Sequence, residues 1–362
     1  MRNSLGDNVI LTIFGESHGP LVGGTLDNLP PGLKVDEERI KKALSKRRPN
    51  GINSTARVEK DNFQIVSGVF NGFTTGDPLT ILIPNENTHS QDYPLGLVRP
   101  GHCDFVMHEV SGGYNDYRGG GHTSGRITAA IVALGEIAKM ALENKGVAIA
   151  SHALCIGGAF DRSFSNLEDD IETLKEKEFP ALLDSARDEM QQKIEDAKRQ
   201  SNSVGGVTET AIVGLPLGLG DPWFASLEGV LSNAMFALGG VKGIEFGDGF
   251  AFAALQGDRA NDPMVYKGDK ATFLSNHNGG VNGGISNGMP VIFRLAVKPI
   301  SSIGIKQRSI NFENKENVEL QLKGRHDPCI VHRVCPTIDG LASIVIMDEI
   351  VKAFGKGYFN NK

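Results

Sequence analysis

The feature that most constrains this chain is Gly119-Gly120-Gly121, three consecutive glycines that stand shortly before a long helical pattern. Glycine adds no side chain to a core and loses much backbone entropy on ordering, so packing alone does not explain the run. The pattern over residues 127–142 predicts a helix, and a helix N-terminus favours anions. The run therefore predicts backbone that approaches a ligand closely, with phosphate as the expected group. A tight turn beside a solvated basic face is the alternative.

Cationic and titratable side chains crowd the stretch around the glycines. Two hydroxyls, those of Thr123 and Ser124, follow close behind. Arginine presents a planar fork of donors that matches phosphate and carboxylate, and histidine changes its charge near neutral pH. The stretch therefore predicts an anion site that also has proton donors. The arginines and histidines in it are Arg99, Arg118, Arg126, His102, His108 and His122.

Composition narrows the class of protein. With 362 residues, 40% of them hydrophobic, the chain can bury a large core, and no linker or repeat divides it, so we expect one domain over residues 1–362. A net charge of -6 argues against nucleic acid as the main partner. The four cysteines form no CxxC pair, there is no signal-peptide pattern, and no apolar run is long enough for a membrane span. We therefore expect a cytoplasmic protein that does not enter membranes.

Hydrophobic periodicity predicts a mixture of strands and helices. The expected helix that begins at residue 36 has Asp36 as its N-cap. The charged, glycine-free stretch 162–203 predicts surface helices without chemistry. Strands are expected at residues 9–14, 63–70, 79–83, 147–154, 207–213 and 291–297, and further helices at 36–48, 127–142, 227–238 and 337–354.

Two short motifs before the glycine run each have two interpretations. His18 lies between Gly15 and Gly19 directly after a predicted strand, where it either faces a cleft or serves the structure. Arg47 and Arg48 end the first predicted helix. There they either complement the helix dipole or bind a phosphate or carboxylate.

The remaining motifs restrict the chemistry. The histidine spacing does not suit zinc, and the glycine clusters match neither a P-loop nor a dinucleotide-binding turn. We therefore expect no metal site. Residues 298–302 end a strand with a lysine and two serines, and Asp327 lies in a separate polar motif. From the residues alone, we infer an enzyme that binds phosphorylated ligands and has histidines and Asp327 available for proton transfer.

Eight motifs in one order resemble the chorismate synthase family over nearly the whole chain. They are G-E-S-H-G at 15–19, R-R-P at 47–49, R-P-G-H at 99–102, R-G-G-G at 118–121, V-K-G-I-E-F-G-D-G-F at 241–250, S-N-H-N-G-G-V-N-G-G-I-S at 275–286, K-P-I-S-S at 298–302 and G-R-H-D-P at 324–328. The resemblance implies an α+β fold, a β-α-β sandwich, assembled as a homotetramer. It also implies anti-1,4-elimination of phosphate from 5-enolpyruvylshikimate 3-phosphate to give chorismate. That reaction requires reduced FMN, with NADPH as a candidate indirect reductant.

The resemblance also assigns roles to individual residues. His18 and His102 are the expected acid pair, one near the leaving phosphate and one near the flavin, and Asp327 assists removal of the substrate proton. The expected substrate-binding residues are Arg47, Arg48, Arg99, Arg126 and Arg325. The expected FMN-binding residues are Arg47, His122, Thr123, Ser124, Gly283, Lys298, Pro299, Ile300, Ser301, Ser302 and Arg325. The alternatives are a non-catalytic flavin- or phosphate-binding protein and a flavin oxidoreductase.

Overall fold

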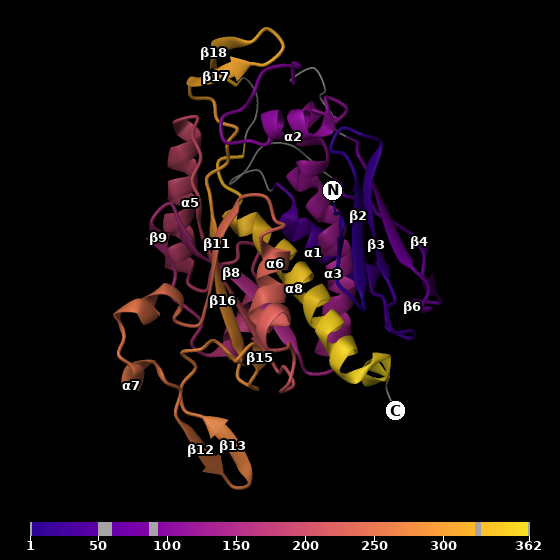
Figure 1. Cartoon of the computed structure of the whole chain (residues 1–362), viewed down its shortest axis with the longest axis vertical. Coiled ribbons are helices and arrows are strands. Elements are labelled where there is room, and N and C mark those ends of the chain that lie inside the picture. The colour runs from indigo at the N-terminus through magenta and orange to yellow at the C-terminus, as the bar shows by residue number, and fades with distance from the viewer. Residues whose placement is uncertain (1, 50–59, 87–92, 323–326, 361–362) are drawn as a thin grey trace.

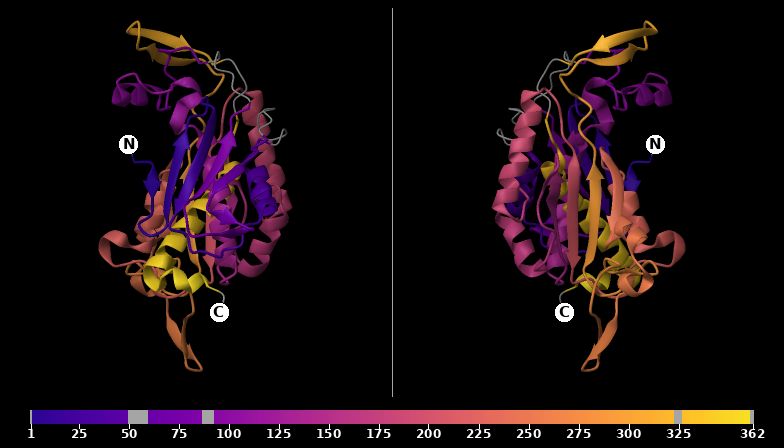
Figure 2. Two further views of the ribbon diagram at one scale, coloured as in Figure 1. Left: turned by 90° about the vertical axis from the view of Figure 1, so that its right-hand side faces the viewer. Right: turned by 90° about the vertical axis from the view of Figure 1, so that its left-hand side faces the viewer.

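Two five-stranded antiparallel sheets enclose a layer of helices in the computed structural model, which describes residues 2–49, 60–86, 93–322 and 327–360 (Figure 1). The two sheets lie on opposite sides of the molecule (Figure 2). The predicted α+β class and β-α-β sandwich are confirmed. Sheet one has the order β1 (Ser4–Leu5), β2 (Ile10–Gly15), β3 (Leu21–Asp27), β7 (Leu79–Pro84), β4 (Gln64–Ser67). Sheet two has the order β11 (Val241–Phe246), β16 (Val291–Val297), β10 (Gly206–Val213), β8 (Ala148–Ile156), β9 (Ala159–Phe160).

Four helices form the inner layer, namely α1 (Glu37–Arg47), α3 (Thr128–Glu143), α6 (Leu227–Met235) and α8 (Val331–Phe354). Helix α3 packs on sheet one, α8 packs on sheet two, and α1 contacts both helices. Because both faces of this layer are covered, α3 and α8 are apolar nearly all round. A Cβ at Gly135 would lie 2.3 Å from the Cα of Gly340, so the two helix backbones approach each other more closely than any side chain permits.

One carboxylate on α8 holds the start of the chain in place. Asp348 accepts hydrogen bonds from the backbone N–H groups of Asp7, Asn8 and Val9, at 3.0, 2.6 and 2.7 Å. These three residues lead directly into β2, the second strand of sheet one. The C-terminal helix therefore fixes the N-terminal segment as well as the core.

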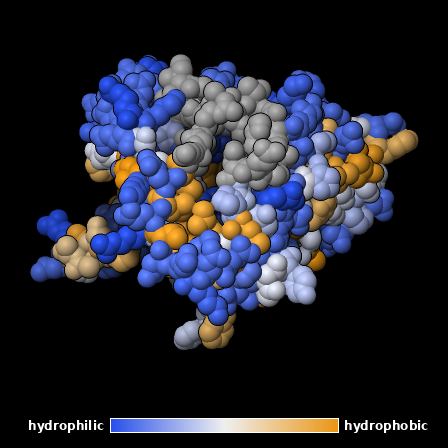
Figure 3. Space-filling model, turned by 90° about the horizontal axis from the view of Figure 1, so that it is seen from above, coloured by the Kyte–Doolittle hydropathy of each residue, from blue (hydrophilic) through white to orange (hydrophobic). Residues whose placement is uncertain are grey.

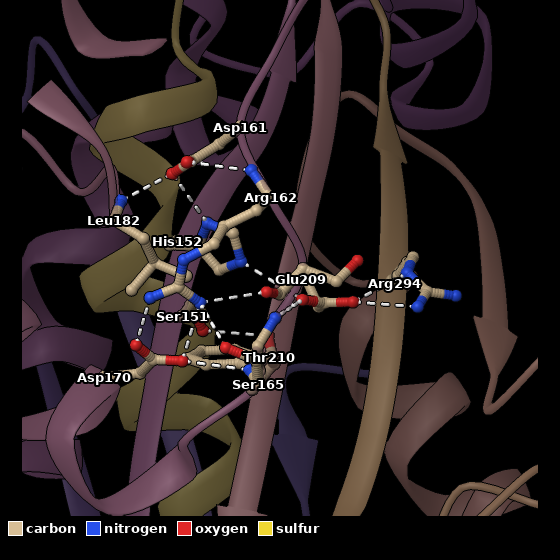
Figure 4. A network of polar contacts seen from close by, with 12 residues as sticks. Ser151, His152, Asp161, Arg162, Ser165, Asp170, Leu182, Glu209, Thr210 and Arg294 are labelled. Carbon is tan, nitrogen blue, oxygen red and sulfur yellow. Dashed lines mark hydrogen bonds and ion pairs between the residues drawn. The ribbon is translucent and has the colours of Figure 1, made fainter. Parts of the chain in front are cut away.

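A row of charged side chains crosses the outer side of sheet two (Figure 4). His152, Glu209 and Arg294 occupy paired positions on β8, β10 and β16. His152 Nε2 lies 3.2 Å from Glu209 Oε2, and Arg294 Nη2 lies 2.8 Å from Glu209 Oε1. Asp161 lies 3.5 Å from His152 Nδ1 and also accepts the N–H of Leu182. The row fastens the segment that leads to α4 (Leu167–Glu176) and α5 (Asp184–Arg199) onto the sheet.

Most predicted elements are confirmed within a few residues, including Asp36 as the N-cap of α1. The predicted start of the last helix at residue 337 was wrong, because α8 begins at Val331 and continues through Pro336. A proline in the second turn removes one backbone hydrogen bond, and the buried residues on both sides of Pro336 keep the helix continuous. The elements that were not predicted individually include β1, β3, β9, β11, α2 (Asp104–Ser111), α7 (Gly257–Ala260) and the strand pairs β5 (Val69–Phe70)–β6 (Phe73–Thr74), β12 (Met264–Lys267)–β13 (Lys270–Phe273), β14 (Val281–Asn282)–β15 (Ile285–Ser286) and β17 (Gln307–Asn311)–β18 (Glu316–Leu320).

The loops that carry most of the predicted site residues gather at the end of the molecule where α2 lies (Figure 1). Seen from that end, the surface is largely hydrophilic, with apolar residues gathered near its middle (Figure 3). Helix α2 itself exposes Phe105, Val106 and Val110. None of the helices in the described part of the chain is long and apolar enough to cross a membrane.

Candidate active site

The three glycines form a turn that passes between two histidines. Gly119, Gly120 and Gly121 have φ values of 63°, 100° and 53°, which residues with a side chain rarely adopt. A Cβ at Gly119 would lie 2.2 Å from Cε1 of His18, and a Cβ at Gly120 would lie 3.2 Å from Cε1 of His102. The groups that the turn approaches closely are the two predicted acids, and the predicted approach to a phosphate ligand stays a prediction. The glycine turn therefore brings both histidines to one place.

His18 is held at the end of β2 by the residue before it. Ser17 Oγ lies 3.1 Å from His18 Nδ1 and is 3.3 Å from the carbonyl oxygen of Arg118, to which it donates. The backbone N–H of Ser17 also donates to the carbonyl of Gly121. The ring of Tyr93 meets the imidazole edge-on, with centroids 5.1 Å apart. His18 is thus fixed against the glycine turn and stays partly exposed, as a proton donor to a ligand requires.

His102 shares a carboxylate with Arg99. His102 Nδ1 lies 2.6 Å from Asp104 Oδ1, and Arg99 makes a two-pronged pair with the same carboxylate through Nε at 2.8 Å and Nη2 at 2.7 Å. Burial alone would lower the pKa of His102, but its hydrogen bonds to Asp104 and Cys103 outweigh burial and raise that pKa above its ordinary value. Nδ1 is bonded to Asp104, and on the side of Gly120 a Cβ would lie 3.2 Å from Cε1 and 3.4 Å from Nε2 of the imidazole. This arrangement suits an acid that donates from Nε2.

The end of β16 closes over the loop that holds His102. Lys298 Nζ and Ser301 Oγ donate to the carbonyl of Gly101 at 2.7 and 2.8 Å. Arg99 Nη1 donates to Ser302 Oγ at 3.2 Å. The structure therefore places residues 298–302 beside the predicted acid, although about 200 residues separate the two in sequence.

Three of the predicted substrate-binding arginines converge on Asp61. Arg47 Nη2 and Arg48 Nε lie 3.1 and 3.3 Å from Oδ2 of Asp61, and Arg126 Nη1 bonds Oδ1. The side chain of Asp61 has no exposed surface. Burial alone would raise the pKa of Asp61, but Arg47 and Arg126 outweigh burial and keep that pKa below its ordinary value. The cluster therefore contains a buried, ionised carboxylate among three cations.

Asn85 and Arg333 connect this cluster to two of the predicted proton carriers, His18 and Asp327. Asn85 accepts from Arg126 Nε and donates to the carbonyls of Glu16 and Gly19, on either side of His18. Arg333 donates from Nε to the carbonyl of Arg47 at 2.8 Å and pairs through Nη1 with Asp327. His18, Asp327 and the arginine cluster therefore belong to one continuous polar network.

Some predicted ligands lie elsewhere. His122 turns toward β2, with Nδ1 2.8 Å from the carbonyl of Gly15 and Nε2 3.1 Å from Oδ1 of Asn3. Gly283 lies between β14 and β15, ahead of the start of β16, whereas Lys298 follows the end of that strand. The seven residues of β16 alone span roughly 23 Å. Arg325 lies outside the described residues.

Thr123 and Ser124 face the glycine turn and the following helix. Thr123 Oγ1 donates to the carbonyl of Gly120 at 2.7 Å, and Ser124 Oγ accepts the N–H of Arg126 at 3.3 Å. Thr123 Oγ1 also lies 2.8 Å from Sγ of Cys103, the residue after His102. This contact joins Thr123 to the loop that holds His102. Both hydroxyls therefore stay within the site that the sequence predicted.

Sequence reasoning missed Asp61, Asp104 and Asn85. Asp104 stands two residues after His102 and is the first residue of α2. Its nearness to His102 in sequence was the only signal that could have identified it. Asp61 and Asn85 act through arginines distant in sequence, which no local pattern marks. Among the described residues, no group of three or more His, Cys, Asp or Glu side chains could hold a metal ion.

Comparison with known proteins agrees with the geometry. The family model for chorismate synthase matches residues 9–351. A chorismate synthase of Thermococcus gammatolerans is 41% identical over 94% of this chain and 95% of its own length, and that of Wolinella succinogenes is 42% identical over 98% and 96%. A crystal structure of a chorismate synthase superposes with a TM-score of 0.77 at 27% identity, over 97% of this chain and 94% of the other. The chain belongs to the chorismate synthase family.

Proposed function

We propose that this enzyme, a lyase, eliminates phosphate from 5-enolpyruvylshikimate 3-phosphate to give chorismate. The observation that carries the proposal is the glycine turn, which brings His18 and His102 together near Arg99 and the arginine cluster on Asp61. The substrate carries a phosphate and two carboxylates, and arginines bind such groups well. Family membership favours this activity over a non-catalytic binding protein or a flavin oxidoreductase.

We infer that the residues at the end of β16 hold reduced FMN. Lys298 has three N–H groups, of which Gly101 takes one, so the ammonium can still meet a phosphate. Ser301, Ser302 and Thr123 add hydroxyls nearby, and the apolar surface of this end suits a flat ring. Reduced FMN, when bound, would supply electrons transiently to a reaction without net redox change. The donor set therefore fits the cofactor that the family implies.

The protein groups divide the proton chemistry among themselves. A departing phosphate needs a proton, and His18 and His102 can hold protons near neutral pH. Asp327, ion-paired with Arg333, is the proposed carboxylate that assists removal of the substrate proton. The resemblance gives Arg47 a role in binding both substrate and FMN. Arg47 bonds Asp61 together with Arg48 and Arg126, and this shared contact favours the substrate role.

An anaerobic assay with 5-enolpyruvylshikimate 3-phosphate tests the proposed function. We expect phosphate release with reduced FMN and none with oxidised FMN or without flavin, because no residue of the described site can supply electrons. Turnover in a flavin-free anaerobic preparation would contradict the cofactor assignment. Steady oxidation of NADPH without substrate would instead favour an oxidoreductase.

Replacing Arg48 with alanine is expected to raise the KM for the substrate by about one to two decades. A hydrogen bond to a charged group contributes roughly 1.5–3 kcal/mol, which corresponds to that change in affinity. Arg199→Ala is the matched control, because Arg199 pairs with Asp196 on the outer helix α5 and its side chain is 68% exposed. An unchanged KM in Arg48→Ala would leave Arg48 with only its helix-dipole role.

We further propose that the enzyme is a cytoplasmic homotetramer and that NADPH acts only as an indirect reductant. Trp223, Phe224 and Phe250 are 87%, 102% and 84% exposed, and aromatic residues of this kind are enriched at protein interfaces. These exposed aromatic side chains support an assembly of several subunits.

A further inference from the structure

We propose that Asp61 is a positioning residue for phosphate binding, which fixes the guanidinium groups of Arg47, Arg48 and Arg126. The inference rests on the proposed substrate role of these arginines. Three guanidinium groups that meet at one point repel one another, and a central carboxylate offsets this repulsion. Asp61 is suited to that place because it is fully buried and accepts bonds from all three.

The two oxygens of Asp61 join separate parts of the fold. Oδ2 accepts from Arg47 and Arg48 at the end of α1, whereas Oδ1 accepts from Arg126, just before α3. Asp61 therefore links the end of α1 to the segment that leads into α3. Its backbone has a φ of 47°, a conformation that few residues adopt readily and that Asp and Asn tolerate best.

The geometry leaves Arg48 able to meet a ligand. Its bond to Asp61 uses the Nε–H, and 27% of its side chain is exposed, against 5% for Arg47 and 6% for Arg126. A planar guanidinium held through Nε points its terminal N–H groups in a fixed direction. Asp61 thereby orients the most accessible cation of the cluster.

The negative charge of Asp61 also weakens phosphate binding by reducing the positive charge of the cluster. This effect is opposite to that of positioning, so removing the carboxylate shows which of the two is larger. If the carboxylate acted only by reducing positive charge, its removal would strengthen binding of any phosphate. If it positions the arginines, its removal weakens binding, because the guanidinium groups separate. Inorganic phosphate, as a competitive inhibitor, reports which effect prevails.

The experiment uses Asp61→Asn, which keeps size and tolerates the same backbone conformation. We expect the KM for 5-enolpyruvylshikimate 3-phosphate and the inhibition constant of inorganic phosphate each to rise roughly 10- to 100-fold. kcat should change less, since the arginines bind ground state and transition state alike. Values equal to or below those of the unmodified enzyme would overturn the inference.

Two further variants separate positioning from loss of stability. Asp348→Asn removes a buried carboxylate that holds backbone N–H groups far from the arginines, so it should lower Tm and leave both constants unchanged. Arg48→Lys keeps the charge but loses the Nε–H bond to Asp61, and it remains informative if Asp61→Asn does not fold. We expect its KM to rise at least tenfold, and an unchanged KM would overturn the inference.

Arg48→Ala separates the positioning role of Asp61 from the proposed role of Arg48 in substrate binding. An unchanged KM in Arg48→Ala overturns the substrate role of Arg48 and the inference together. A raised KM there with an unchanged KM in Asp61→Asn overturns the inference alone. In the double variant, Asp61→Asn should add little to Arg48→Ala, because Asp61 acts largely through that arginine.

Discussion

Gly119→Ala is expected to lower kcat by about 10²–10⁴, the range for loss of a positioned acid or base. The added methyl group would lie 2.2 Å from Cε1 and 2.5 Å from Nδ1 of His18, so the imidazole must move. The backbone at φ 63° also disfavours alanine. Steady-state kinetics with reduced FMN measure the effect of displacing His18 on kcat. Thermal unfolding measures the effect of the strained backbone on stability.

Gly125→Ala is the control for this variant. Gly125 lies in the same stretch of chain, but a Cβ there meets no atom within 4 Å. We expect nearly unchanged kcat. If Gly119→Ala also kept its kcat, either His18 would not be an acid or the turn would adapt. Comparison with His18→Ala decides between these cases, because only the first leaves that variant active.

Asp104→Asn is expected to lose most of what His102→Ala loses, again about 10²–10⁴ in kcat. The Asp104 carboxylate helps raise the pKa of His102 above its ordinary value. An acid works only while protonated, so activity persists up to this raised pKa and falls at higher pH. Without the carboxylate the pKa of His102 falls. The alkaline limb of the rate profile should therefore move to lower pH.

Rate profiles against pH and an NMR titration of His102 check this expectation. Asp170→Asn is a suitable control, because Asp170 also pairs with an arginine, Arg162, but lies on the outer side of sheet two. Its profile should match that of the unmodified enzyme. An alkaline limb that stays in place in Asp104→Asn would show that Asp104 serves Arg99 and not His102.

The fold was largely predictable because its elements have local signals. Alternating or β-branched runs marked β2, β4, β7, β8, β10 and β16, and Asp36 marked the start of α1. The start of α8 was not predictable, since Pro336 looks locally like a helix boundary. Short hairpins such as β12–β13 are largely exposed on both faces, so their sequences lack the alternation of apolar and polar residues that marks a half-buried strand.

The predictable part of the site consists of residues that belong to sequence motifs. His102 and the serines at 301 and 302 lay in recognisable motifs, and the structure brings them together. Asp61 was not predictable, because a single acid in a charged stretch gives no sign of three distant arginines. The glycine run shows a further limit, since it indicated close approach but not that the approached groups were His18 and His102.

The hydrogen bonds of Asp348 also bear on how fast the molecule can fold. They join backbone groups to a carboxylate that stands 339 to 341 positions further along the chain. Closing so long a loop costs entropy before the contacts that reward it can form. Helix α8 is also the surface on which sheet two packs. The sandwich therefore closes through contacts between distant parts of the chain, which is the topology of a slowly folding protein.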